Sequence, residues 1–276
     1  MLTRYVALVS EQSSITPSEL TRVAAALQKQ AVRDFGPIWE VEATVDAFTK
    51  LEDVPLDYWP IIVKDDIGDP SAAGYHDDEQ GQPFSLVQFD QGWHLTASHE
   101  LVEMLGDPFG RRMVAGDSPV AGQGRVKFLV EVADPSEDAS YSYTINGIQV
   151  SDFYTPRYFD PVKVSGVRYS YTGAITGPRQ VLKGGYLSWY VPATKKWWQR
   201  TWFSGSKAAD RALGKLNVRN GNLRGAIDRE TEAQRKKAMG SGKGNAATRR
   251  PAATPASFTS RANDIRAAIT AAGRRR

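Results

Sequence analysis

The stretch SHELVEMLGDP, residues 98–108, contains four side chains that could bind a metal ion. A helix turns by about 100° per residue, so His99, Glu100, Glu103 and Asp107 would share one arc of about 100°, opposite the apolar residues. His99 and Glu103 are one turn apart, a spacing at which two helical side chains can bind one ion. The pattern predicts a metal site on this face, and a solvated acidic surface is the alternative.

The type of ion follows from the ligands that the chain offers. It contains no Cys, which excludes thiolate sites and disulfides and leaves His, Asp, Glu and backbone oxygen. Imidazole and carboxylate are zinc ligands, and carboxylates also suit harder ions. We therefore expect a divalent metal, with zinc as the first choice and calcium as the alternative. The oxygen-rich stretch DPSEDAS, residues 134–140, is a second calcium candidate that lacks EF-hand spacing.

A third ligand must come from another part of the chain, because no His follows His99. Asp107 is the nearest candidate in the sequence. The strand and loop that follow the helix could bring in a carboxylate from the stretch EVADPSE, namely Glu131, Asp134 or Glu137.

His76 is a candidate of a different kind. It lies in a Gly-rich and Asp-rich stretch, residues 65–83, that we expect to form a loop. There it could line the site as a metal ligand, or act in catalysis as a hydrogen-bond donor to the reacting substrate. A solvated surface residue is the alternative.

The sequence before the site helix predicts the order β-α-β-β. Thr16, Pro17 and Glu19 are typical of a helix start, as N-cap, first-turn proline and capping-box residue. Gly36 is expected to end this helix. Hydrophobic patterns predict strands at 4–9, 39–48, 58–64 and 84–89, the last directly before the site helix.

The sequence after the site helix is richer in strands. The expected strands are 126–132, 141–145, 148–150, 167–172, 185–191 and 197–203. Asn146-Gly147 predicts a two-residue hairpin. Two basic helices are expected at 206–216 and 223–239. The predicted fold class is therefore α+β, with an N-terminal β-α-β-β part and site helix, a β-rich part and a basic C-terminal arm.

Charge divides the chain at residue 203. Residues 1–203 contain 18 Lys and Arg against 26 Asp and Glu, whereas residues 204–276 contain 17 against 5. This predicts an acidic folded domain at 1–203 and a basic arm at 204–276 that is partly helical and partly disordered unless bound. An anionic partner would suit the arm: nucleic acid, a neighbouring protein subunit or the acidic domain itself. A solvated tail is the alternative.

The composition also bears on location. No apolar run approaches the roughly 18 residues of a membrane helix, and the first residues lack the pattern of a secretory signal. We expect a soluble protein without a membrane partner, either cytoplasmic or virion-associated.

The order of elements and the pair His99-Glu100 resemble the zincin fold of metallopeptidases over about residues 4–110. The resemblance implies that His99 binds zinc and that Glu100 is the general base that activates water. Glu103 stands in place of the second zincin His, and zinc also accepts a carboxylate there. Phe109 stands where extended zincin motifs have a third His. The resemblance further implies that the strand before the helix borders the substrate cleft.

A second resemblance is carried by four phrases: GYH (74–76), SHELVEMLGDPFG (98–110), EVADPSE (131–137) and VSDFYTPRYF (150–159). They resemble a group of bacterial and phage proteins with zincin-like character. This implies that His76, His99, Glu100, Glu103 and Asp107 belong to one site.

The expected function is a metal-dependent hydrolase, a zinc metallopeptidase acting on a peptide or protein substrate. The alternative is a non-catalytic structural or interaction protein, such as a phage virion component. Such a protein would keep a zincin-like scaffold and use the basic arm for assembly or for contact with nucleic acid.

Overall fold

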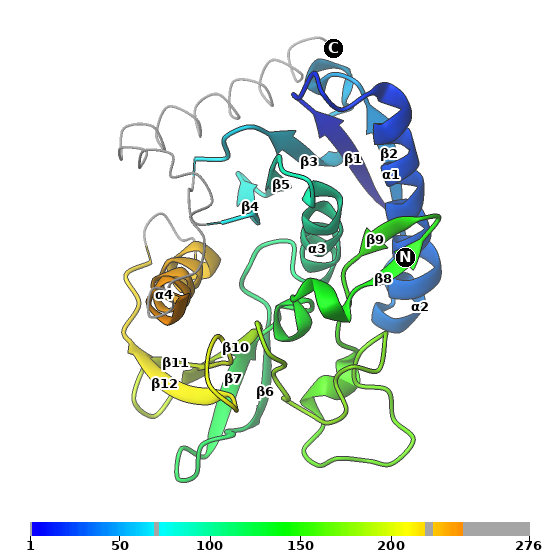
Figure 1. Cartoon of the computed structure of the whole chain (residues 1–276). Coiled ribbons are helices and arrows are strands. Elements are labelled where there is room, and N and C mark those ends of the chain that lie inside the picture. The colour runs from blue at the N-terminus through cyan, green and yellow to red at the C-terminus, as the bar shows by residue number, and fades with distance from the viewer. Residues whose placement is uncertain (1, 69–71, 219–222, 240–276) are drawn as a thin grey trace. The chain divides into compact units, whose positions relative to one another are not determined.

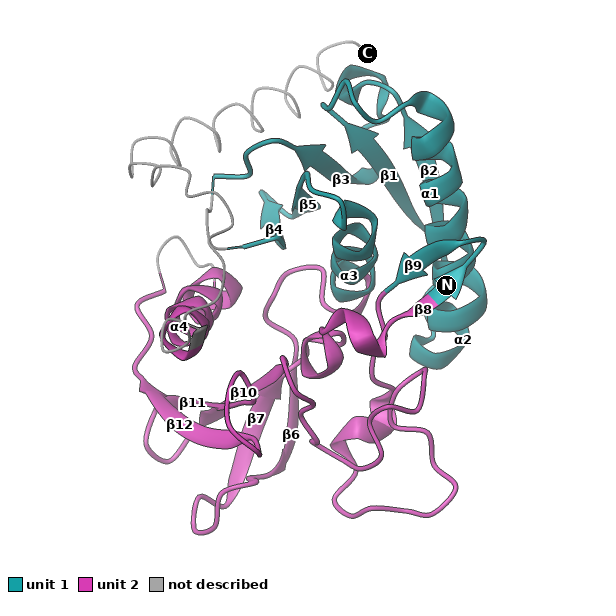
Figure 2. Ribbon diagram, in the orientation of Figure 1, with its two compact units in different colours: residues 1–104, 144–150, 245–276 teal, residues 105–143, 151–244 magenta. Residues whose placement is uncertain are grey.

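The computed structural model describes residues 2–68, 72–218 and 223–239. They form two compact units (Figure 2). The first contains the described residues up to Met104 together with Thr144–Val150, and the second contains Leu105–Tyr143 and the described residues from Ser151 onward. Each unit combines a sheet with helix, which confirms the expected α+β class. Residues 240–276, the last part of the expected basic arm, lie outside the described residues.

The sheet of the first unit has the strand order β2-β1-β3-β5-β4 (Figure 1). Its strands are β1 (Arg4–Ser10), β2 (Ala43–Phe48), β3 (Tyr58–Lys64), β4 (Gly74–Glu79) and β5 (Gln82–Gln88). All neighbours are parallel except β4, which is antiparallel to β5. The middles of β1 and β3 are apolar and buried, as strands covered on both faces of a parallel sheet require.

Strand β4 is a correction to the sequence analysis, which assigned residues 65–83 to a loop. Gly74–Glu79 pair with β5 across a turn at Gln80 and Gly81, whose φ angles are 54° and 84°. Asp and Glu are rare in strands, and here three acidic residues at 77–79 concealed one. Strand β5, which precedes the site helix, therefore lies inside the sheet, and β4 forms the edge.

Helix α1 (Pro17–Lys29) begins as expected, because the Thr16 hydroxyl accepts a hydrogen bond from the Glu19 amide at 3.2 Å. The expected end at Gly36 was wrong. The chain continues through a π-helical turn (Gln30–Phe35) into α2 (Gly36–Trp39) and leaves the helix at Glu40, with φ 55°. A Cβ atom at residue 36 would lie 2.6 Å from the Val41 carbonyl oxygen, so the glycine permits a close backbone approach.

Helix α3 (Trp93–Gly106) carries the quoted motif and is deeply buried. Its apolar residues Ala97, Leu101, Val102 and Met104 are each 0% exposed. The Ser98 hydroxyl donates to the Gln30 side-chain oxygen at 2.8 Å, which links α3 to the π-helical turn. These contacts fix the rotation of α3 about its axis, and that rotation decides where the motif side chains point.

The second unit contains an antiparallel sheet of order β12-β11-β10-β7-β6. Its strands are β6 (Met113–Asp117), β7 (Arg125–Leu129), β10 (Tyr186–Val191), β11 (Lys196–Thr201) and β12 (Ala209–Gly214). Helix α4 (Leu223–Met239) confirms the second expected basic helix, and its Ile227 packs in an apolar cluster with Leu129, Tyr186 and Trp197.

The helix expected at 206–216 was wrong, because residues 209–214 form strand β12, which pairs with β11. The strand expected at 167–172 was also wrong, since only a single bridge joins Ser170 to Tyr154.

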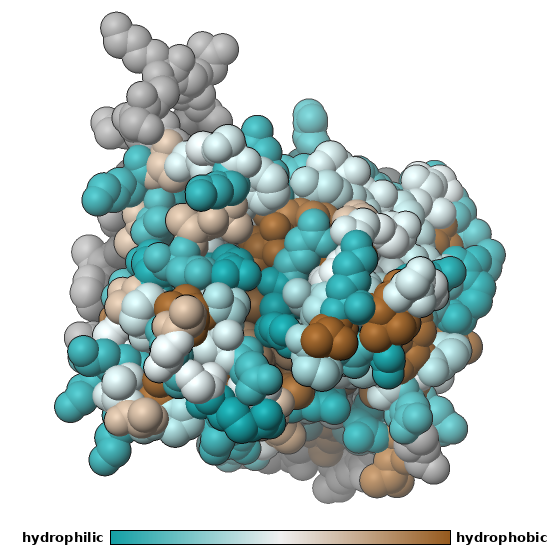
Figure 3. All heavy atoms as spheres, turned by 90° about the horizontal axis from the view of Figure 1, so that it is seen from below, coloured by the Kyte–Doolittle hydropathy of each residue, from teal (hydrophilic) through white to brown (hydrophobic). Residues whose placement is uncertain are grey.

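The hairpin at Asn146-Gly147 is confirmed. It joins β8 (Tyr143–Ile145) to β9 (Ile148–Val150), and both turn residues have positive φ, 52° and 78°. Among the described helices, none is long and apolar enough to span a membrane. The face drawn in Figure 3 is mainly hydrophilic, with apolar residues in small groups, as is usual for a folded protein surface.

Candidate metal centre

Two side chains of α3 face each other as their spacing predicts. The distance from His99 Nε2 to Glu103 Oε1 is 4.0 Å. The side chain of His99 is 14% exposed and that of Glu103 is 0% exposed. The carboxylates of this helix face are thus buried, and the alternative of a solvated acidic surface does not describe them. A buried carboxylate needs a partner or a cation to offset the loss of hydration.

His99 and Glu103 could both bind one ion from this helix alone. Ligand atoms around a tetrahedral zinc ion are about 3.4 Å apart, given metal–ligand distances of about 2.0–2.1 Å. The 4.0 Å between His99 and Glu103 therefore needs only a small rotamer adjustment. Imidazole and carboxylate are both ligands that zinc accepts.

Asp107 is held by the loop that follows α3. Its Oδ2 accepts a hydrogen bond from the Arg112 amide at 2.5 Å, and its Oδ1 accepts one from the Phe109 amide at 3.4 Å. Both oxygens thus stabilise the chain reversal after the helix. These contacts engage the oxygens that Asp107 would offer to an ion.

Glu131 and Asp134 surround an arginine of α4 in the second unit. Arg224 Nε lies 3.0 Å from Glu131 Oε1 and 3.0 Å from Asp228 Oδ1, and its Nη2 lies 3.4 Å from Asp134 Oδ2. The side chain of Arg224 is only 7% exposed. Burial by itself lowers the pKa of Arg224, but the charges of the three carboxylates outweigh burial and raise the pKa above its usual range.

Sequence reasoning missed Arg224, although a signal for it existed. Arg224, Ile227 and Thr231 recur at helical spacing, and all three are buried. An arginine on the apolar side of a helix needs buried acidic partners. Glu137, the last acidic residue of the candidate stretch, instead pairs with Arg235.

His76 and Glu100 form a second buried pair in the first unit. His76 Nδ1 lies 3.5 Å from Glu100 Oε2, and the two side chains are 0% and 4% exposed. His76 lies in strand β4 and is buried, so the expectation that it lies in a loop was wrong. Its imidazole faces the residue that the zincin resemblance implies as the general base.

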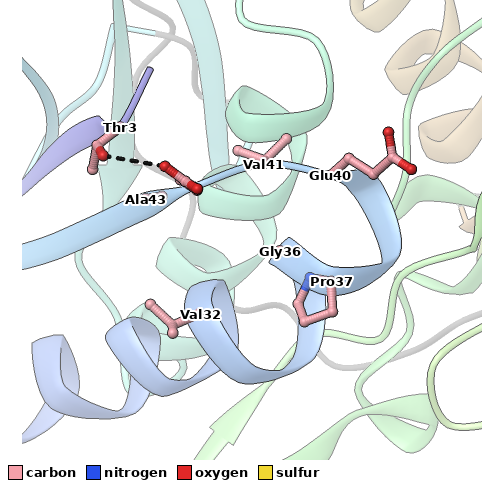
Figure 4. Close-up of a pocket in the computed structure, with 8 residues that line it drawn as sticks. Thr3, Val32, Gly36, Pro37, Glu40, Val41 and Ala43 are labelled. Atoms are coloured by element: carbon pink, nitrogen blue, oxygen red, sulfur yellow. Dashed lines mark hydrogen bonds between the residues drawn. The ribbon is translucent and has the colours of Figure 1, made fainter. Parts of the chain in front are cut away.

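The first unit also contains a cavity of about 490 Å³ away from these residues (Figure 4). Its lining includes Val32, Gly36, Pro37 and Val41, and the Thr3 hydroxyl beside it donates to a Glu42 oxygen at 3.5 Å. None of the candidate site residues contributes to its lining. The cavity therefore has no part in the metal centre.

His99 and Glu103 could hold a divalent ion, and Glu100 follows His99 directly in the helix as a carboxylate able to accept a proton. His76 lies against that carboxylate.

No family model, curated protein or solved structure matches this chain.

Proposed function

We propose that the protein is a metal-dependent hydrolase that cleaves peptide bonds. The observation that carries the proposal is the pair His99 and Glu103, with ligand atoms 4.0 Å apart and Glu100 adjacent to His99. The side chain of Glu103 is fully buried, which suits neutralisation of its carboxylate by a cation. Zinc is the metal that best fits this donor set, and calcium is the alternative.

The topology of the first unit supports a zincin-like scaffold. Four parallel strands and the antiparallel edge strand β4 precede α3, which carries the His-Glu pair. An edge strand leaves one row of backbone N–H and C=O groups without a neighbouring strand, and an extended peptide can pair with such a row. In the proposal, a peptide substrate pairs with β4.

Each residue has a defined task in this proposal. A bound zinc ion would polarise the scissile carbonyl and lower the pKa of water to about 7. Glu100 accepts the proton of the attacking water and passes it to the leaving amine. His99 and Glu103 would hold the ion and fix its position relative to Glu100.

Metal binding is the direct test of the site. Wild-type protein is expected to bind about one zinc ion per chain, and His99→Ala or Glu103→Ala should weaken binding by more than about 100-fold, because loss of outer partners alone costs about 10–100-fold. Titration with a chromophoric zinc chelator measures both. His94→Ala is the matched control. Undiminished binding in His99→Ala would refute the site.

A second candidate function rests on charge. Residues 240–276 contain eight Lys and Arg and one Asp. We propose as the alternative that this segment contacts an anionic partner, nucleic acid or a neighbouring subunit, in a structural or virion-associated protein. Polycationic segments release counterions when they bind nucleic acid, so such binding weakens steeply with salt.

Truncation after Met239 tests the charge-based candidate. Because it removes eight basic residues, affinity for single-stranded and double-stranded DNA should fall. For the full chain, the logarithm of affinity should fall linearly with the logarithm of salt concentration. Fluorescence anisotropy measures this. A salt-independent affinity, or equal affinities of the two chains, would remove nucleic acid as the partner.

A further inference from the structure

The carboxylate of Glu100 lies against two residues of the edge strand β4. Side chains two residues apart in a strand project from the same face, so Gly74 and His76 share one face of β4. His76 Nδ1 lies 3.5 Å from Glu100 Oε2. A Cβ atom at residue 74 would lie 3.0 Å from Glu100 Oε1 and 2.7 Å from Thr96 Cγ2. One oxygen of Glu100 therefore faces an imidazole, and the other faces the space that a glycine leaves.

This arrangement matters because a glutamate carboxylate is not fixed by its own torsions. Rotation about the last side-chain bond has only a broad, roughly two-fold preference. The orientation of the Glu100 oxygens must therefore be set by what they contact. No described residue donates a hydrogen bond to Glu100 Oε2, and His76 Nδ1 lies 3.5 Å from it. A 3.5 Å separation shortens to a hydrogen bond with a small shift, as catalytic contacts do when substrate binds.

We propose that His76 is a positioning residue for Glu100. Its imidazole holds one carboxylate oxygen, and the absence of a side chain at Gly74 leaves room for the other. The contact links the base to the strand on which we place the peptide, so the substrate backbone and the base share one support. The kinetic part of this inference rests on the proposed hydrolase function; the contact itself does not.

The contacting atom of His76 selects the test variants. Asn places its amide nitrogen close to the position of Nδ1, whereas Leu has nearly the shape of Asn without its polar atoms. His76→Asn should keep kcat within a few-fold of wild type, and His76→Leu should lower kcat by about 100-fold with KM almost unchanged, because misplacement of a catalytic group by about 1 Å costs about that much. His94→Leu, the same substitution outside β4, is the matched control and should keep both constants.

A spectroscopic measurement tests the contact without any substrate. The chain has only three His residues, so ¹⁵N-histidine labelling gives three imidazole spin systems that single substitutions can assign. In metal-free protein, Glu100→Gln should shift the Nδ1 resonance of His76 and leave that of His94 in place. If wild-type protein hydrolyses no peptide, the proposed function fails while this spectrum still decides the contact. An unchanged His76 resonance, or equal kcat losses in His76→Asn and His76→Leu, would overturn the positioning role.

Discussion

Glu100→Gln is expected to lower kcat for peptide hydrolysis by about 10³-fold while the zinc content stays that of wild type. The amide keeps nearly the size and shape of the carboxylate but cannot accept a proton, and general-base catalysis contributes about 10²–10⁴-fold to rate. Because Glu100 is not one of the proposed ligands, His99 and Glu103, metal binding should be spared. Peptide-library hydrolysis followed by mass spectrometry, with zinc content measured on the same samples, gives both quantities.

The control for Glu100→Gln is Glu79→Gln, which makes the same change at the end of β4. That variant should keep wild-type kcat and zinc content. Substitution of Glu100 should therefore lower the rate without loss of metal. Substitution of His99 or Glu103 should lower both the rate and the metal content. If Glu100→Gln retains full activity, another group is the base and the zincin-like mechanism is wrong. If it loses its metal, Glu100 is a ligand.

The sequence predicted features that depend on neighbouring residues. The start of α1 is set by Thr16 and Glu19 within one turn, and the β8–β9 hairpin is set by two residues that tolerate positive φ. Helical spacing likewise predicts that the side chains of His99 and Glu103 face each other. The 4.0 Å between His99 Nε2 and Glu103 Oε1 agrees with this prediction. In each case the decisive interaction lies within four residues of chain.

The sequence did not reveal features that depend on distant partners. Strands β4 and β12 are polar edge strands whose pairing with β5 and β11 outweighs a weak strand propensity. Their identity as strands therefore comes from their partners. Gly36 is a further example. Nothing in the sequence indicates that the Val41 carbonyl packs against this residue, so the glycine predicts a helix end although it is needed for close packing.

The residues of the candidate site also differ in whether local or distant interactions determine them. The α3 residues follow from local spacing, but the third ligand stays one of several carboxylates, because no local rule says which distant residue reaches the same ion. Each of these carboxylates has other contacts: Asp107 accepts hydrogen bonds from backbone amides, and Glu131 and Asp134 both lie against Arg224. Burial was equally beyond the sequence: Glu103 reads as a surface residue by type and is 0% exposed.

Arg224→Met is expected to destabilise the second unit by about 3–5 kcal/mol. The substitution preserves most of the apolar stem but removes the guanidinium that Glu131, Asp134 and Asp228 surround. Loss of one partner from a buried ionic cluster leaves uncompensated charges, and this costs about 3–5 kcal/mol. Urea unfolding followed by tryptophan fluorescence measures the loss, because β10 and β11 contain Trp189, Trp197 and Trp198. Arg229→Met, at an exposed position of the same helix, should change stability by less than about 0.5 kcal/mol.

A double variant separates the charge effect from a packing effect. Adding Glu131→Gln to Arg224→Met removes one of the stranded carboxylates, and a buried cluster that is neutralised on both sides often regains stability. The double variant should therefore be more stable than Arg224→Met alone. If the arginine acts only through packing of its stem, Glu131→Gln would bring no recovery, and Arg224→Met would cost no more than Arg229→Met.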